Sequence, residues 1–318
     1  MRHLLAAILF GSTTLFAGQA MATDQKTIAV FTKNATNPAY EAFRIAADQV
    51  ARAAGAKVVH YVPKQPDNVG EQQAMVEQVL KDRPDAVVFI PVDDVAMIDS
   101  VKKLNQAKIP VVLASNPLPG QFVTFVGADD FDIGYKQARY LFDKLGGNAK
   151  IVVIEGTPAA PTNRERVRGY KRALAEYSGI EVLASGAGNY QQPDAKRVME
   201  KFLKDYPQID AVLSANDGMA LGALEALKEA NRTAVLIGIN GILPAVKQIE
   251  AGALLASVDF NMFKIGCTAT RAALRHLRGE KVPEKIMLPA EIIDRTNYKA
   301  WLVPVEQRTC PEWEEVVR

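Results

Sequence analysis

The chain alternates between short apolar runs and longer stretches in which apolar residues recur every three or four positions. From Thr27 onward each strand-length run of β-branched or aliphatic residues leads into an amphipathic helical stretch, and turns containing Pro, Gly, Asn or Asp separate the two. Continuous apolar runs are typical of strands buried on both faces of a parallel sheet. The pattern therefore predicts repeated βαβ units and an α/β fold.

The predicted strands form two series of similar size. The first series is residues 27–31, 57–62, 86–90, 111–114 and 122–126. After the polar turn at 127–130 and a helix at 133–145, the second series is residues 150–154, 182–185, 211–213, 234–239 and 254–259. We predict two doubly wound parallel-sheet lobes joined by a three-segment hinge, with a ligand enclosed between their strand ends.

The rest of the chain is too short for a third domain. A helix at 264–277 and the segment 286–293 are expected to return across the hinge, with crossings near Ala128, Asn261 and Ala290. Ligand contacts to both lobes would favour the closed state. We predict a signal peptide at 1–22, an N-terminal lobe of 23–128 plus 261–290, a C-terminal lobe of 129–260 plus 291–305, and a tail at 306–318.

The N-terminus has the pattern of an export signal. Arg2 and His3 precede an apolar core at 4–16, and small residues end in Ala20-Met21-Ala22, where cleavage is expected. The core is too short for a spanning helix, which needs about 18–20 apolar residues. The residue directly after the expected cleavage site is Thr23 and not a cysteine, so a lipid anchor is not expected. We therefore expect a soluble protein exported to the periplasm.

Charge and motif content argue against nucleic-acid binding and catalysis. The formal net charge is +2, and the basic and acidic residues are interspersed. His60 and His276 are the only histidines after the signal, and neither has a His or Cys at ligand spacing. The G-x-S-x-G elbow and the glycine-rich phosphate signatures are missing. No enzyme activity, metal or cofactor is expected.

Two features of the chain have a structural interpretation. The acidic pairs Asp93-Asp94 and Asp129-Asp130 are interpreted as turn and N-cap formers, because adjacent side chains point apart and make poor acid–base partners. Cys267 and Cys310 are the only cysteines, and in an oxidising compartment they could pair and pin the tail to the body. Two free thiols are the alternative.

The stretch Ser214–Gly222 is the strongest candidate for one edge of a ligand cleft. It follows the buried run 211–213 and leads into a helix, with Asp217 as the expected N-cap and Asn216 at the strand end. In open α/β sheets small ligands bind at that edge, and an amide suits a polyhydroxy compound. The alternative is that Asn216 only caps the helix.

Three motifs resemble the ribose-type periplasmic sugar-binding proteins. They are Thr36-Asn37-Pro38-Ala39-Tyr40, the segment Asn163-Arg164-Glu165-Arg166 with Gly169-Tyr170, and Ala215-Asn216-Asp217 with Met219-Ala220-Leu221-Gly222. The similarity runs over about 27–293. It implies a type I periplasmic binding fold in a monomer that delivers a monosaccharide or related polyol to the membrane permease of an ABC importer.

The resemblance also implies a set of ligand-binding residues. Aromatic side chains would stack on the sugar ring, and amides and an arginine would bond its hydroxyls; plain core packing is the alternative for the aromatics. The positions carried over are Lys33, Asn37, Tyr40, Ser115, Asn116, Arg164, Tyr190, Asn216, Asn240 and Phe260.

The chain departs from the family at several of these positions. Ser115-Asn116 and Asn240 stand where the ribose-type proteins have aspartates, and Lys33 stands where they have a neutral polar residue. The carried-over set then holds cations and no carboxylate, which suggests a sugar acid as ligand. A neutral sugar or polyol is the close competitor, with Asp93 or Asp259 neutralising Lys33.

Two other functions use the same fold. A lactose-repressor-type transcription factor would begin with a helix-turn-helix headpiece, and this chain has a secretion signal in that place. An exported sensor subunit would present the closed form to a membrane kinase or chemoreceptor, and the sequence does not separate this function from transport.

Overall fold

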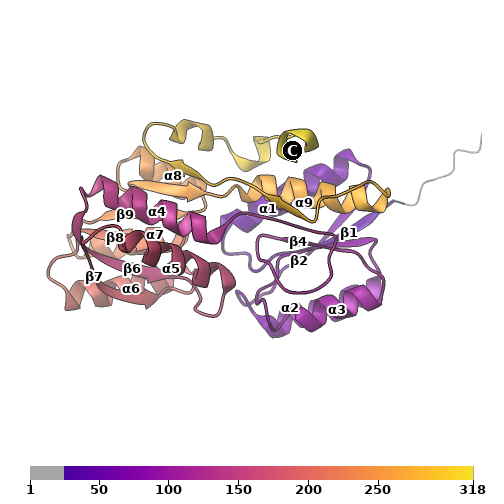
Figure 1. The fold of residues 1–318 in the computed structure, drawn as a ribbon, viewed down its shortest axis with the longest axis horizontal. Coiled ribbons are helices and arrows are strands. Elements are labelled where there is room, and N and C mark those ends of the chain that lie inside the picture. Colours follow the sequence, from indigo (N-terminus) through magenta and orange to yellow (C-terminus); the bar gives the residue numbers. More distant parts are fainter. Residues whose placement is uncertain (1–24, 318) are drawn as a thin grey trace, which may run out of the picture.

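A computed structural model describes residues 25–317 as two lobes that lie side by side (Figure 1). The predicted signal peptide at 1–22 lies outside the described residues. Each lobe has a six-stranded, mainly parallel sheet with helices on both faces. The predicted fold class, two doubly wound α/β lobes, is confirmed.

The N-terminal lobe is built on the strand order β11-β5-β4-β3-β1-β2. Its parallel pairs include Ile28 with Val58 and Ile28 with Ala86. The strands are β1 (Thr27–Phe31), β2 (Lys57–Tyr61), β3 (Ala86–Phe89), β4 (Val111–Ala114), β5 (Thr124–Gly127) and β11 (Lys285–Met287). The helices are α1 (Pro38–Ala53), α2 (Val69–Asp82), α3 (Ile98–Gln106) and α9 (Met262–Leu277).

The C-terminal lobe repeats this order as β12-β10-β9-β8-β6-β7, with β12 antiparallel to β10. The strands are β6 (Asn148–Glu155), β7 (Gly179–Ala187), β8 (Ala211–Ser214), β9 (Val235–Ile239), β10 (Ala256–Asp259) and β12 (Glu291–Ile293). The helices are α4 (Asp130–Lys144), α5 (Pro161–Leu174), α6 (Gln192–Asp205), α7 (Asp217–Glu229) and α8 (Leu243–Glu250). In both lobes the chain reverses direction across the sheet beside the first strand, so a crevice opens there at the strand ends.

The chain passes between the lobes at the β5–α4, β10–α9 and β11–β12 connections. Helix α4 contacts β8, β9 and β10 of the second sheet, whereas α9 contacts β3, β4 and β5 of the first. We propose on this basis the division predicted above, with residues 23–128 and 261–290 in one lobe and 129–260 and 291–305 in the other.

Helix α4 begins three residues earlier than predicted. The Asp129 carboxylate accepts hydrogen bonds from the backbone N–H groups of Phe131 and Asp132, at 3.0 and 3.2 Å. This cap satisfies N–H groups of the first turn and lets the helix start at Asp130 rather than at Ile133. Asp129 is therefore an N-cap, as its position in an acidic pair predicted.

Close packing of α4 on α5 determines which side of α5 faces the lobe. A Cβ at Gly169 would lie 2.3 Å from the carbonyl oxygen of Phe131, so only glycine permits this approach of the two helices. Arg166, Tyr170 and Ala173 lie with Gly169 at helical spacing on the buried side of α5.

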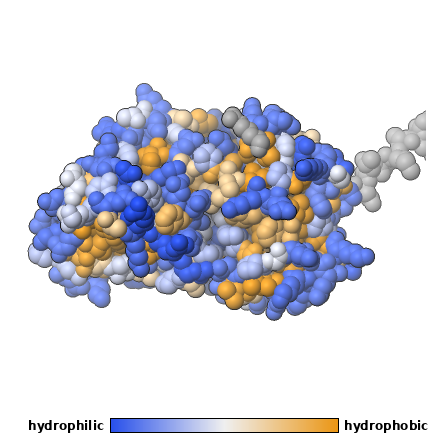
Figure 2. All heavy atoms as spheres, viewed as in Figure 1, coloured by the Kyte–Doolittle hydropathy of each residue, from blue (hydrophilic) through white to orange (hydrophobic). Residues whose placement is uncertain are grey.

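On the surface, polar and apolar residues are interspersed over the face shown in Figure 2.

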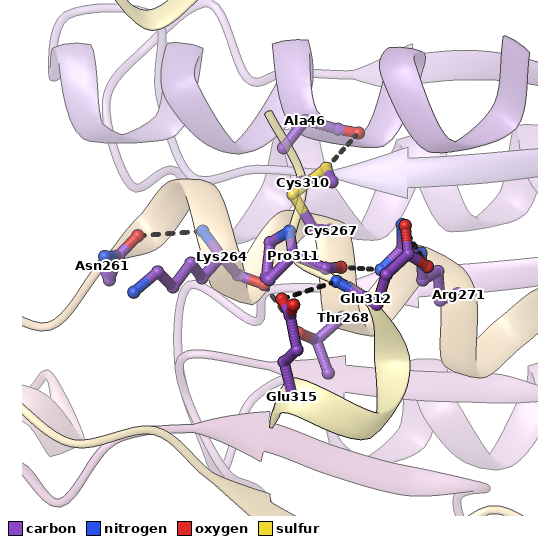
Figure 3. Close-up of a disulfide and its surroundings, with 10 residues drawn as sticks. All are labelled: Ala46, Asn261, Lys264, Cys267, Thr268, Arg271, Cys310, Pro311, Glu312 and Glu315. Atoms are coloured by element: carbon purple, nitrogen blue, oxygen red, sulfur yellow. Dashed lines mark hydrogen bonds and ion pairs between the residues drawn. A yellow bond between two sulfur atoms is a disulfide. The ribbon is translucent and has the colours of Figure 1, made fainter. Parts of the chain in front are cut away.

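The tail crosses from one lobe to the other. After β12 it forms the short helices η1 (Tyr298–Trp301), η2 (Val305–Gln307) and α10 (Trp313–Val316); η1 contacts α8, and α10 contacts α9. Cys310 forms a disulfide with Cys267 of α9, beneath Ala46 of α1 (Figure 3). Arg271 of α9 donates to the carbonyl of Pro311 next to it. The tail is thus bonded covalently to the N-terminal lobe.

Candidate functional site

A cavity lies between the two lobes at the carboxyl ends of their strands. Segments following β1, β4, β8, β9 and β10 contribute to it, together with the first turns of α1 and α5. Its walls are Lys33, Asn34, Asn37, Ala39, Tyr40, Asp67, Ser115, Asn116, Thr162, Arg166, Tyr190, Asn216, Asn240, Phe260 and Met262. All of the predicted ligand-binding residues except Arg164 are among them. Their role in binding a ligand stays a prediction.

Arg164 does not line this cavity. Its side chain is 47% exposed and its Nη2 pairs with the Asp94 carboxylate of the other lobe at 2.6 Å. It also donates to the carbonyl of Ala159. Arg164 was predicted to lie in the cleft. In the structure it instead forms a partly exposed ion pair that bridges the two lobes.

Arg166, two residues further along α5, is the arginine of the cavity. Its side chain is 5% exposed, and Nε and Nη2 both lie 2.9 Å from Oδ1 of Asp130. Nη1 donates to the carbonyl of Ala215 at 2.8 Å, and the guanidinium lies 5.3 Å from the ring centroid of Phe260. Because residues two apart lie on different sides of a helix, Arg164 and Arg166 cannot share one role.

Lys33 is buried on the opposite wall. Its ammonium lies 4.0 Å from Oδ1 of Asp67 and 5.9 Å from the centroid of the Tyr190 ring. The carboxylates considered from the sequence lie elsewhere: Asp93 accepts from Val95 N and Ala96 N in its own turn, and Asp259 binds Trp301 Nε1 and Asn261 N. Lys33 is paired within the protein, as the alternative foresaw, but through another aspartate.

The cavity therefore contains carboxylates. Asp67 lines it, and Asp130 lies directly behind Arg166. Burial raises the pKa of Asp130, and the Arg166 guanidinium opposes that shift. The carried-over positions hold no carboxylate, but both of these acids lie outside that set, so the cleft as a whole is not free of carboxylates. Each cation has an acidic partner, so the positive balance that suggested an acidic ligand is absent.

Three aromatic rings line the cavity, as predicted. Tyr40 lies on α1, and Tyr190 and Phe260 come from the other lobe. Burial raises the pKa of Tyr190 to about 12 and that of Tyr40 well above its ordinary value, so both phenols stay neutral at physiological pH. The Tyr190 hydroxyl lies 3.0 Å from Thr162 Oγ1, and its ring packs on Gly156, where a Cβ would lie 2.1 Å from the ring.

The amides of the cavity each make at least one contact within the protein. Asn37 caps α1 through a 3.0 Å bond from Ala39 N, and its Oδ1 also accepts from Asn240 Nδ2 of the other lobe at 3.2 Å. Asn116 donates to the carbonyl of Pro91 at 3.0 Å. These bonds orient the amides while leaving further donor and acceptor capacity.

Asn216, not Asp217, is the N-cap of α7. Its Oδ1 accepts from Met219 N at 2.8 Å, and its Nδ2 donates to the carbonyl of Tyr190 at 3.3 Å while the side chain lines the cavity. Asp217 lies underneath, fully buried, and accepts from Ser257 Oγ at 2.6 Å and Ile242 N at 2.9 Å. The expected cap is thus corrected by one residue, and Asn216 combines capping with a place at the cavity.

Several cavity residues have a left-handed backbone. The φ values are +56° for Asp67, +58° for Ser115, +59° for Tyr190 and +126° for Asn240. Such values are uncommon for residues other than glycine and cluster at functional sites. They turn the chain sharply as it leaves a strand or loop, so that its side chains face the cavity.

Hydrogen bonds between the lobes hold them close to one another. Besides the Asn37–Asn240 and Asp94–Arg164 contacts, Thr36 Oγ1 donates to Gln191 Oε1 at 3.1 Å. The structure therefore has the lobes in a closed arrangement.

The sequence analysis missed two charged residues of the site, and only one of them lies in a recognisable sequence pattern. Arg166 falls in the buried helical register of α5 with Gly169, Tyr170 and Ala173, and this spacing could have identified it. Asp67 lies six residues beyond β2 in an irregular loop, and no sequence pattern marks it.

The chemistry of the cavity is that of binding. It combines neutral aromatic rings, amides, hydroxyls and two acid–base pairs. Among the described residues, no three His, Cys, Asp or Glu side chains gather where they could hold a metal ion. Within residues 25–317, no helix is long and apolar enough to cross a membrane.

A family model described as a periplasmic binding protein domain matches residues 28–281. The chain belongs to the periplasmic binding protein family. Among curated relatives, the ribose import binding protein of Bacillus subtilis (strain 168) is 32% identical over 267 residues, which cover 84% of this chain and 86% of that protein. These relatives are binding proteins, in agreement with the expectation that the chain is not an enzyme.

Solved structures of the same family match almost the whole fold. A periplasmic solute-binding protein from Actinobacillus succinogenes with bound D-allose has a TM-score of 0.83 at 25% identity, covering 87% of this chain and 100% of that one. A solute-binding protein from Bacillus halodurans with bound myo-inositol has a TM-score of 0.81 at 26% identity, covering 87% and 97%. The resemblance to the ribose-type proteins is thereby confirmed.

Proposed function

We propose that this periplasmic binding protein captures a monosaccharide or sugar-derived polyol between its lobes and delivers it, as a monomer, to the permease of an ABC importer. The observation that carries the proposal is the interlobe cavity, in which three aromatic rings face amides, hydroxyls and paired charges from both lobes. Rings of this kind stack on the apolar faces of a sugar, and the polar groups match its hydroxyls.

The charge balance of the cavity favours a neutral compound over a sugar acid. Lys33 and Arg166 have Asp67 and Asp130 as partners, so both cations already face a carboxylate, and an anionic ligand would also meet Asp67 in the cavity wall. The relatives favour the same conclusion. One is named as a ribose import binding protein, and two solved structures contain D-allose and myo-inositol; all three compounds are neutral and carry several hydroxyl groups.

Calorimetric titration of the purified protein with neutral sugars, polyols and sugar acids tests the binding proposal. We expect micromolar or tighter binding of at least one neutral compound with one site per chain. Failure of every compound to bind would contradict the proposal.

Transport needs a separate experiment. Deletion of the gene should abolish growth on the compound that binds, and reintroduction should restore it. If the deletion strain grows normally but no longer changes its gene expression in response to the compound, the protein is instead an exported sensor.

A further inference from the structure

Lys33 is a buried residue that lines the cavity, and its ammonium makes no hydrogen bond to any residue in 25–317. The residue is 2% exposed, and the nearest opposite charge is Asp67 Oδ1 at 4.0 Å, beyond hydrogen-bond distance. The Tyr190 ring, 5.9 Å away, offers only its face. An ammonium carries three N–H donors, and burial of an unsatisfied charged donor is costly. Lys33 therefore lacks acceptors that a bound molecule can supply.

Asp67 is held in place to face Lys33. Its backbone N–H donates to the carbonyl of Lys33 at 3.0 Å, and its φ of +56° turns the side chain toward the cavity. Oδ1 also accepts from Asn34 Nδ2 at 3.2 Å. The backbone bond keeps Asp67 next to Lys33, and a gap of 4.0 Å remains between the Lys33 ammonium and the Asp67 carboxylate.

We propose that Lys33 and Asp67 together recognise a single hydroxyl group of the bound sugar or polyol, an inference that rests on the proposed function. A hydroxyl oxygen accepts from the Lys33 ammonium while its hydrogen is donated to the Asp67 carboxylate. Two atoms 4.0 Å apart can both reach one oxygen at the usual distance of about 2.8 Å.

This arrangement discriminates between ligands, because a group other than a hydroxyl leaves Lys33 or Asp67 without a hydrogen-bond partner. A carboxylate at the same position accepts from Lys33 but has no hydrogen for Asp67 and repels it, and an ammonium has the reverse defect. A deoxy compound satisfies neither residue. Sites built to bond a hydroxyl reject analogues that lack it much more strongly than apolar pockets reject a missing methylene. Lys33 is on this view a specificity residue rather than an attractor of anions.

The test begins with calorimetry of the wild type against D-ribose, D-allose, xylitol, erythritol, myo-inositol and D-ribonate. The tightest neutral binder becomes the parent compound, and each of its monodeoxy analogues is then titrated. We expect one analogue to lose at least 100-fold in affinity, and D-ribonate to bind more weakly than the neutral compounds.

The variants Lys33→Met and Lys33→Met/Asp67→Asn identify which hydroxyl the pair contacts. Both should bind the parent compound at least 10-fold more weakly than wild type. The double variant should bind the parent and the critical deoxy analogue within about threefold of each other, because nothing remains to distinguish them. The double variant also avoids leaving Asp67 buried without its partner. Lys64→Met, a change at an exposed neighbouring lysine, should match the wild type.

Distinct results overturn distinct claims. If the parent compound binds but the double variant discriminates against the same deoxy analogue as strongly as wild type, the hydroxyl is read elsewhere and the inference fails while the proposed function stands. Binding of D-ribonate alone also overturns the inference. If no compound of the panel binds the wild type, the proposed function fails, and the inference fails with it.

Discussion

The two walls of the cleft each carry a buried cation opposite a carboxylate, but the two pairs are built differently. On the C-terminal wall, Arg166 makes close contacts to Asp130 and to the carbonyl of Ala215 and lies against Phe260. On the N-terminal wall, Lys33 has one partner, Asp67, at 4.0 Å. The Arg166 guanidinium has hydrogen-bond partners within the protein, whereas the Lys33 ammonium gains hydrogen-bond partners, on our proposal, only from a bound molecule.

This difference suggests a division of work between the lobes. A planar guanidinium with fixed partners positions the strand ends and the aromatic face of the C-terminal wall. A flexible ammonium with unfilled donors adapts to the molecule that enters. We therefore expect changes on the C-terminal wall to alter stability and changes on the N-terminal wall to alter selectivity.

The largest expected effect is that of Arg166→Met. Removing the guanidinium leaves Asp130 buried without its partner and Ala215 without its donor, which should destabilise the folded state by about 3–5 kcal/mol. Urea denaturation followed by circular dichroism measures the loss.

Lys33→Met is the matched comparison on the other wall. Because the Lys33 ammonium makes no close bond and its own desolvation is costly, its loss should cost clearly less stability than the loss of Arg166, at most about 1 kcal/mol. Equal destabilisation by the two variants would contradict the division between the walls.

The second prediction concerns the pH dependence of Asp217, which lies beneath Asn216 of the C-terminal wall. Burial raises the pKa of Asp217 to about 7 from an ordinary value of 3.8, so the folded protein binds a proton at this carboxyl more tightly than the unfolded chain does. Its contribution to stability is complete below about pH 4 and is lost as the pH rises through about 7. Between pH 5 and pH 8 the loss should be about 3 kcal/mol, because each pH unit between the two pKa values corresponds to about 1.4 kcal/mol.

Asp217→Asn should remove this dependence, because an amide does not titrate. The difference in unfolding free energy between wild type and variant, measured by urea denaturation at several pH values, isolates Asp217 from the other acids. A difference that stays constant from pH 5 to pH 8 would show that Asp217 does not titrate in this range.

The third prediction is the effect of Asn216→Ala. The change removes the cap of α7 and the bond to the carbonyl of Tyr190, which should cost about 1 kcal/mol of stability. It should also weaken binding of a sugar, since the amide faces the cavity. Thermal denaturation and calorimetry measure the two losses; Asn216→Ser, which retains a cap, should recover stability but not affinity. Equal recovery of both would assign Asn216 to structure alone.

The fold could be predicted in detail because continuous apolar runs report strands buried on both faces. The strands at 27–31 and 111–114 have the predicted bounds, and most of the others differ by one or two residues at an end. Two starts are three residues earlier than predicted, those of β7 and α4; the shift of α4 comes from a capping side chain that periodicity does not register.

The site was predictable where its residues directly follow strands. Lys33, Ser115, Asn216 and Asn240 are placed at the cavity by the carboxyl ends of parallel strands, which meet at one edge. Asp67 could not be found in this way, because an irregular loop brings it back to Lys33, two residues after β1. The partner of Lys33, and with it the charge of the cleft, depends on that loop.

The smallest expected effect lies outside the cavity, at the ion pair between Asp94 and Arg164 that joins the rims of the two walls. Arg164→Ala removes an interlobe contact that is partly exposed, so the cost should be at most about 1 kcal/mol and should shrink as salt is added. Because this pair forms only when the lobes are close, its loss should appear in the affinity for a sugar as a modest, salt-dependent weakening rather than a change of selectivity. Calorimetry at low and high salt, with Arg168→Ala as a control at an exposed arginine of the same helix, measures it. A loss as large as that of Lys33→Met would place Arg164 in the binding site after all, and the two walls would then no longer differ as the structure indicates.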